Sequence, residues 1–199
     1  MEFDNILNLW IIPFSVTMIF FLFYYCKTTI IKIAKKSRKK SDFLFLLDNF
    51  RINIDDWKKT ILLPIISAIL LNVIVMAVFM AKPVKYDIPF WFLASMPGFA
   101  NPVSEEFLIR GFLLGLFVFG AWKFRFKDKN KYFLYFIGLI FLSYIFTISH
   151  INMTLYQYVI RFSNSILFSI LYLINKRNLL PSIIAHAAGN WLFILGQGF

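Results

Sequence analysis

Six apolar runs of about twenty residues recur along the chain, and they constrain its fold more than any other feature. They cover residues 6–26, 61–81, 107–122, 132–148, 153–174 and 179–196. A helix needs roughly 20 apolar residues to cross a bilayer, because each residue adds about 1.5 Å along its axis and the hydrocarbon core is about 30 Å thick. Hydrophobic residues make up 60% of the chain, well above the share in soluble domains. The pattern predicts an all-α, polytopic transmembrane helical bundle with about six spans.

A further apolar piece, residues 90–100, is too short to cross a bilayer and contains Pro97 and Gly98. Non-helical backbone is tolerated at membrane depth only where protein or trapped water satisfies its polar groups. The piece therefore predicts a short broken or re-entrant segment that leads into the span at 107–122.

The net charge of +11 is distributed unevenly along the chain. Lysine and arginine gather at residues 27–59, 123–131 and 176–177, so the positive-inside rule places these connections in the cytosol and the loop at 82–89 outside. Basic residues beside a membrane span favour anionic membrane lipids as partners rather than nucleic acid. The stretch at 43–57 is compatible both with an amphipathic helix along the inner interface and with a plain loop. Abundant Ile, Phe, Lys and Asn indicate an AT-rich genome, and the small size indicates a bacterial protein. We therefore expect a multi-pass protein of a bacterial plasma membrane.

Two adjacent glutamates and an arginine occur where an apolar run begins. Glu106 and Arg110 are four residues apart, so on a helix they can pair along one face, whereas Glu105 is rotated by about 100° and points elsewhere. Ser104 predicts a helix start, with both carboxylates in the first turn. A plain helix N-terminus with one surface ion pair is the alternative, but ionisable residues within apolar spans are costly and indicate a functional site.

The only two histidines of the chain lie at or inside the ends of predicted spans. His150 is four residues after Phe146, and His186 is four residues before Asn190, so each pair shares one helical face. A single histidine in such a position is more often a satisfied core residue. Two of them, together with Glu105, favour a catalytic site.

Three short motifs carry a resemblance to a known family. "EEFLIR", "FTISH" and "HAAGN" match EExxxR, FxxxH and HxxxN, in the order typical of the CAAX protease and bacteriocin-processing (CPBP or Abi) family of intramembrane endopeptidases. The resemblance covers residues 91–196. It implies a catalytic core of about four transmembrane helices at 90–199, preceded at 1–89 by two transmembrane helices and a basic cytosolic loop.

The resemblance also implies roles for individual residues. Glu105 and His150 would activate a water molecule, and His186 and Asn190 would stabilise the oxyanion of the tetrahedral intermediate. The residues that would support the site are Glu106, Arg110 and Phe146. The implied substrate is a small membrane-associated peptide or protein, such as a peptide pheromone, a bacteriocin leader or a CAAX-like chain.

Alternatives remain for the mechanism and for the function. Glu105, His150 and His186 form a legitimate zinc ligand set, but HExxH is missing, so a metal-free glutamate mechanism without a cofactor is preferred. A non-catalytic membrane regulator or a bacteriocin-immunity protein would have the same fold. A small transporter is less favoured, because no internal repeat is visible.

The predicted span ends place the candidate site residues at different depths in the membrane. Glu105 and His150 lie near the outer ends of their spans, whereas His186 lies near the cytosolic end of the last one, a mismatch of roughly 10 Å. Arg161 is expected to extend to the membrane interface. The alternative is that it contacts a glutamate or a substrate carboxylate within the cavity.

Overall fold

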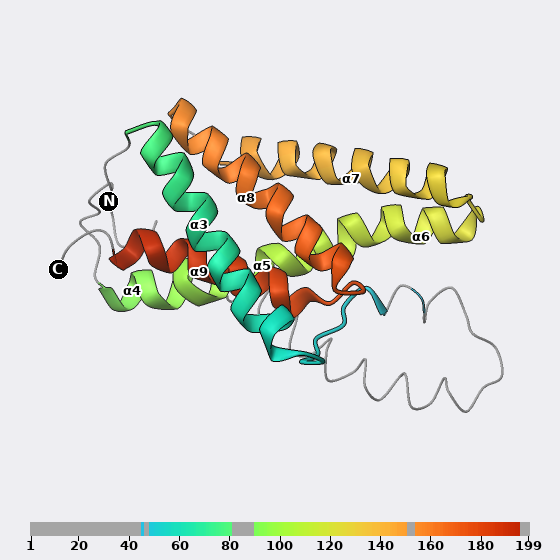
Figure 1. Cartoon of the computed structure of the whole chain (residues 1–199), viewed down its shortest axis with the longest axis horizontal. Helices are drawn as coiled ribbons and strands as arrows, with labels where there is room; N and C mark the ends of the chain where they lie inside the picture. The colour runs from blue at the N-terminus through green and yellow to red at the C-terminus, as the bar shows by residue number, and fades with distance from the viewer. Residues whose placement is uncertain (1–44, 46–47, 81–89, 151–153, 196–199) are drawn as a thin grey trace, which may run out of the picture.

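The computed structural model describes residues 45, 48–80, 90–150 and 154–195. This part of the chain is built from helices and contains no strand, which confirms the all-α prediction (Figure 1). The predicted span at 6–26 and the loop at 82–89 lie outside the described residues.

Three of the described helices are long and apolar enough to cross a membrane. They are η1 (Lys58–Leu62) with α3 (Leu63–Val78), α7 (Asp128–Ile148) and α8 (Leu155–Ile174), and α9 (Leu179–Leu195) is apolar but shorter. On α3 the large side chains of Ile66, Leu70 and Ile74, at helical spacing, are about half exposed, as expected of a face that contacts lipid. The predicted count of six spans is not confirmed.

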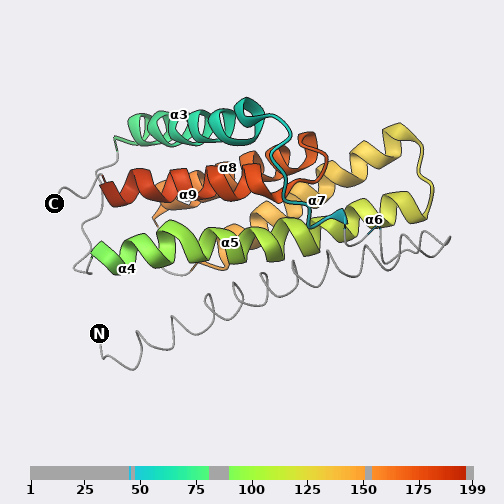
Figure 2. The ribbon, with the colours of Figure 1, turned by 90° about the horizontal axis from the view of Figure 1, so that it is seen from below.

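The segment at 90–100 is part of one long helix and not a separate broken piece. Five helical segments follow each other without a gap: α4 (Phe90–Ser95), η2 (Met96–Ala100), α5 (Asn101–Glu106), η3 (Phe107–Leu114) and α6 (Gly115–Lys123). Figure 2 shows this path running across the molecule. Pro97 is the second residue of η2 and Pro102 the second residue of α5, and η2 and η3 are π-helical, so the helix continues through both prolines.

The predicted helix start at Ser104 is therefore wrong. Ala100 already has helical backbone angles (φ −67°, ψ −43°), and no side chain caps α5. The Ser104 hydroxyl instead donates a hydrogen bond to the Asn101 carbonyl within the helix (3.1 Å). Glu105 consequently lies roughly four turns after Phe90, in the interior of the long helix.

Helix α9 lies between α3 and the long helix and runs antiparallel to the latter (Figure 2). The register is visible in contacts along its length. Asn190 donates a hydrogen bond to the Pro97 carbonyl (2.6 Å), His186 lies beside Glu106 (2.9 Å), and Leu179 packs at Gly111. Side chains near the middle of both helices are thereby brought to the same level.

In the stretch at 43–57, Phe45 and Asp48 are helical, whereas residues 49–56 form a turn and irregular backbone. They pack across the long helix, where Asn49 and Phe50 are buried. The Asn49 amide donates to the Gly115 carbonyl (3.1 Å), and the ring of Phe50 occupies the space left by the missing side chain of Gly111. Asn49 and Phe50 therefore belong to the core, whereas Ile54 and Trp57 of the same stretch are exposed.

Candidate active site

A fully buried ion pair forms the base of the site. Arg110 Nη1 lies 3.0 Å from Glu106 Oε1, and neither side chain is accessible to solvent, which confirms the pairing predicted from their spacing. A buried carboxylate is tolerated only when its charge is compensated. The pair therefore depends on its surroundings to satisfy the remaining donors of the guanidinium.

Helix α8 supplies those surroundings. Arg110 donates to the Ser165 carbonyl (2.8 Å) and hydroxyl and to the Ser169 hydroxyl (3.3 Å). Its guanidinium also lies over the rings of Phe146 (5.2 Å) and Phe168 (5.5 Å). Sequence reasoning assigned no role to these serines, although two hydroxyl residues four apart in an apolar span are a readable signal.

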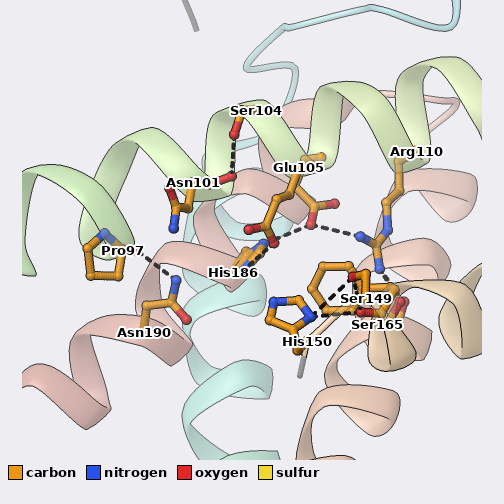
Figure 3. A network of polar contacts seen from close by, with 12 residues as sticks. Pro97, Asn101, Ser104, Glu105, Arg110, Ser149, His150, Ser165, His186 and Asn190 are labelled. Carbon is orange, nitrogen blue, oxygen red and sulfur yellow. Dashed lines mark hydrogen bonds and ion pairs between the residues drawn. The ribbon is translucent and has the colours of Figure 1, made fainter. Parts of the chain in front are cut away.

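His186 lies between the two glutamates. Its Nδ1 is 2.9 Å from Glu106 Oε1, and its Nε2 is 3.7 Å from Glu105 Oε2. The imidazole stacks on Phe168 with ring centroids 4.8 Å apart, which fixes its plane. Figure 3 shows both histidines on the side of the long helix to which the Glu105 carboxylate points. The predicted depth mismatch is absent, because Glu105 lies within a longer helix that runs antiparallel to α9.

The two glutamates differ in how far they are satisfied. The Glu105 side chain retains 28% of its exposure, whereas Glu106 has none. Among the described residues, Oε2 of each carboxylate is buried without a hydrogen-bond partner. Unsatisfied buried oxygens are uncommon in folded proteins and are a mark of catalytic or binding sites. Of the two side chains, only that of Glu105 is partly accessible to solvent.

His150 does not pair directly with Glu105 within the described residues. Its Nδ1 lies 2.8 Å from the Phe146 carbonyl and 3.3 Å from the Ser149 hydroxyl. Because a carbonyl only accepts, Nδ1 carries the proton in the neutral ring and Nε2 carries the lone pair. His150 lies beyond the end of α7, and burial lowers the pKa of its imidazole, with the charge of Arg161 lowering that pKa further. The ring is therefore neutral at pH 7.

A small cavity of about 100 Å³ lies beside His186 and Phe146, and neither Glu105 nor His150 is among the described residues that line it. His186 and Asn190 line it from α9, and Asn164 and Arg161 line it from α8. One N–H of the Asn190 amide is donated to Pro97, and a primary amide has a second one to donate. Arg161 was expected to extend to the membrane interface, but it lines this cavity.

A pair of amides joins α3 to α8 next to the cavity. Asn72 and Asn164 donate to each other's side-chain oxygens (3.2 and 3.0 Å), and Asn72 is fully buried. A side chain at Gly189 would come within 3.2 Å of the Asn72 amide, so the glycine allows α9 to pack against this pair. Sequence reasoning assigned no role to either asparagine.

The alternative zinc ligands do not converge. In the part of the chain that the structure describes, no group of three His, Cys, Asp or Glu side chains is arranged to hold a metal ion. Nδ1 of His150 lies on the Phe146 carbonyl and Nδ1 of His186 lies on Glu106, which leaves Nε2 of each ring as the atom that could face a metal. Among the described residues, Glu105, His150 and His186 are not gathered into one ligand group in this arrangement.

Comparison with protein families matches residues 87–192 to the family described as type II CAAX prenyl endopeptidase Rce1-like. The matched region contains both glutamates, Arg110, both histidines and Asn190. Neither the curated proteins nor the solved structures yield a match. The family match supports an intramembrane protease function in general.

Proposed function

The chain belongs to the type II CAAX prenyl endopeptidase Rce1-like family, and we propose that it hydrolyses a peptide bond in a small membrane-associated peptide, with Glu105 as the general base. One observation carries the proposal. The Glu105 carboxylate has a buried oxygen without a hydrogen-bond partner among the described residues, 3.7 Å from His186 and beside a fully buried ion pair. A carboxylate held in this way is suited to receive a proton from a reacting water.

The proposed reaction is a hydrolysis in which Glu105 transfers a proton from the attacking water to the leaving amine. Glu105 takes a proton from water as the water oxygen bonds to the scissile carbonyl carbon, which forms a tetrahedral oxyanion. The proton then passes from Glu105 to the amide nitrogen as the C–N bond breaks. The products are a carboxylate and an amine, and Glu105 returns to its starting form.

The neighbouring groups have complementary roles in this proposal. The second N–H of Asn190 is directed to the oxyanion, and loss of one such donor typically lowers the rate about 100 to 1000-fold. Neutral His150 accepts a hydrogen bond at Nε2 and orients the attacking water. His186 donates from Nε2 to the oxyanion only with both ring nitrogens protonated, because its Nδ1 faces Glu106. Glu106 and Arg110 hold His186 in place.

The substrate is proposed to be a peptide pheromone, a bacteriocin leader or a CAAX-like chain in a bacterial plasma membrane. A lining cation such as Arg161 suits a substrate with a carboxylate near the scissile bond. Zinc is not needed for this scheme.

The test is cleavage of a fluorogenic candidate peptide by the purified chain in liposomes. Glu105→Gln keeps the shape of the side chain and removes the base, so we expect a rate loss of about 100 to 10,000-fold. Asp128→Asn, an exposed carboxylate on α7, is the matched control and should cleave like the wild type. Undiminished cleavage by Glu105→Gln would overturn the mechanism.

Two further arms separate the alternatives. Addition of a chelator should leave cleavage unchanged, whereas loss of activity restored by zinc would support the metal-dependent version. A Glu105→Gln variant that cleaves nothing but still complements a deletion strain would support the non-catalytic regulator.

A further inference from the structure

A second and larger cavity lies where the turn between α6 and α7 approaches the turn between α8 and α9. It measures about 1330 Å³. Its apolar wall includes Val118, Trp122, Tyr135 and Leu139. Among the described residues that line it, none belongs to the candidate active site. The cavity therefore requires a separate explanation.

Cations surround this cavity, and three of them have an unusual backbone. The basic residues that line it are Lys123, Arg125, Lys131, Lys176 and Arg177. Arg125, Lys176 and Arg177 have positive φ angles of 52°, 55° and 63°. This left-handed region is strained for residues with a side chain, and after a helix it is most often occupied by glycine or asparagine. Both turns thus carry long cations where glycine would be less strained, and all three cations line the same cavity.

The cations differ in whether they are already neutralised. Arg177 pairs with Asp48 (2.7 Å) and lies over the ring of Phe45 (4.4 Å), so it contributes to the wall. Lys131 is 3.4 Å from Asp128. Among the described residues, neither Arg125 nor Lys176 has a carboxylate within salt-bridge distance, and these two charges remain available to a ligand.

We propose that this basic cavity binds an anionic phospholipid of the cytosolic leaflet, with the phosphate at Arg125 and Lys176 and an acyl chain along the apolar wall. The positive-inside rule places both turns on the cytosolic side. Tryptophan and tyrosine are favoured at the headgroup level, where Trp122, Tyr132 and Tyr135 would lie. Basic pockets between transmembrane helices on this side suit anionic headgroups.

The test is native mass spectrometry of the full chain in a neutral detergent, titrated with phosphatidylglycerol or phosphatidylcholine. The Arg125→Gln/Lys176→Gln variant should bind phosphatidylglycerol about 10 to 30-fold more weakly than the wild type, because each cation near an anionic surface contributes roughly fivefold. Lys127→Gln/Lys129→Gln is the matched control, since it removes equal charge from residues that do not line the cavity and should bind normally.

Each remaining outcome contradicts the proposal. An equal loss of phosphatidylglycerol binding in both double variants would indicate general attraction to the basic surface. Binding of phosphatidylcholine as tight as that of phosphatidylglycerol would show that the anionic headgroup has no role. Displacement of the lipid by millimolar inorganic phosphate would identify a free anion as the ligand. Circular dichroism and peptide cleavage verify that each variant is folded. If Arg125→Gln/Lys176→Gln fails these checks, Arg125→Asn/Lys176→Asn replaces it, because asparagine tolerates left-handed backbone. This second variant should show the same loss of lipid binding.

Discussion

Glu106 and Arg110 depend on each other because both are completely buried. Each nitrogen of the guanidinium has a partner, from Glu106 or from the serines of α8. Burial of either charge alone would carry a desolvation penalty of several kcal/mol. The pair is therefore a structural requirement of the site, separate from the chemistry of Glu105.

Removal of one member of the pair should be more damaging than removal of both. We expect Arg110→Met to lower the free energy of unfolding by about 3 to 5 kcal/mol, because it leaves an uncompensated buried carboxylate. The Glu106→Gln/Arg110→Met double variant should recover much of this loss. Denaturant unfolding in detergent micelles measures both, and Arg110→Met with wild-type stability would show that the pair is not buried as described.

His150 allows a direct titration, because the chain has only two histidines. In a His186→Gln background, the imidazole resonances in NMR belong to His150 alone. We expect its pKa to lie below the ordinary value of about 6.5, because burial and then Arg161 lower it. Arg161→Gln should raise this pKa, so protonation begins at higher pH, while Lys129→Gln should leave it unchanged. An unaltered pKa in Arg161→Gln would place Arg161 too far away to act on His150.

At the scale of elements, the long helix is the feature that assembles the site. It presents Glu105 and Glu106 to α9, and its three close-packed glycines face different neighbours. A side chain at Gly111 would come within 2.6 Å of Phe50, one at Gly115 within 2.7 Å of Asn49, and one at Gly98 within 3.2 Å of Trp191. Small residues in membrane helices permit this close approach.

Two glycines of the same helix therefore respond oppositely to alanine. Gly115→Ala should destabilise the protein by about 1 to 3 kcal/mol, because the new methyl group displaces the buried Asn49 side chain and its hydrogen bond to the Gly115 carbonyl. Gly120→Ala is the matched control, since no atom of the described residues lies within 4 Å of its added methyl group, and alanine should stabilise the helix by up to about 1 kcal/mol. Thermal unfolding followed by circular dichroism measures both changes. Equal melting temperatures for the two variants would contradict the packing of residues 48–56 on this helix.

At the scale of the whole molecule, charge and span direction predict the orientation in the membrane. The turn between α6 and α7 is basic, and Met80 lies in the turn just after the end of α3 at Val78, on the other side of the span. The positive-inside rule then places Lys127 in the cytosol and Met80 outside. The candidate lipid cavity is expected on the cytosolic side for the same reason.

Cysteine labelling of intact cells tests this orientation. In a Cys26→Ser background, Met80→Cys should react with a membrane-impermeant maleimide, because this side chain is 89% exposed at the outer end of α3. Lys127→Cys should react only after the membrane is permeabilised. The reverse pattern would invert the topology and move the proposed lipid site to the outer leaflet.

The residues by themselves determined the fold class and the local pairs. Apolar runs of about twenty residues indicate helices, because a single segment of that length satisfies its own backbone in a bilayer only as a helix. The spacing of Glu106 and Arg110 predicted their ion pair, since residues four apart share a helical face. The motifs likewise selected the family to which residues 87–192 are matched.

Only the tertiary structure decided which side chains meet across helices. Sequence reasoning predicted a broken piece at 90–100 and a helix start at Ser104, whereas the helix continues through the prolines with π-helical segments and places Glu105 in its interior. The antiparallel register with α9 then brings His186, and not His150, beside Glu105. Partners on one helix follow from its periodicity, but partners on different helices depend on packing between whole elements, which no local spacing contains.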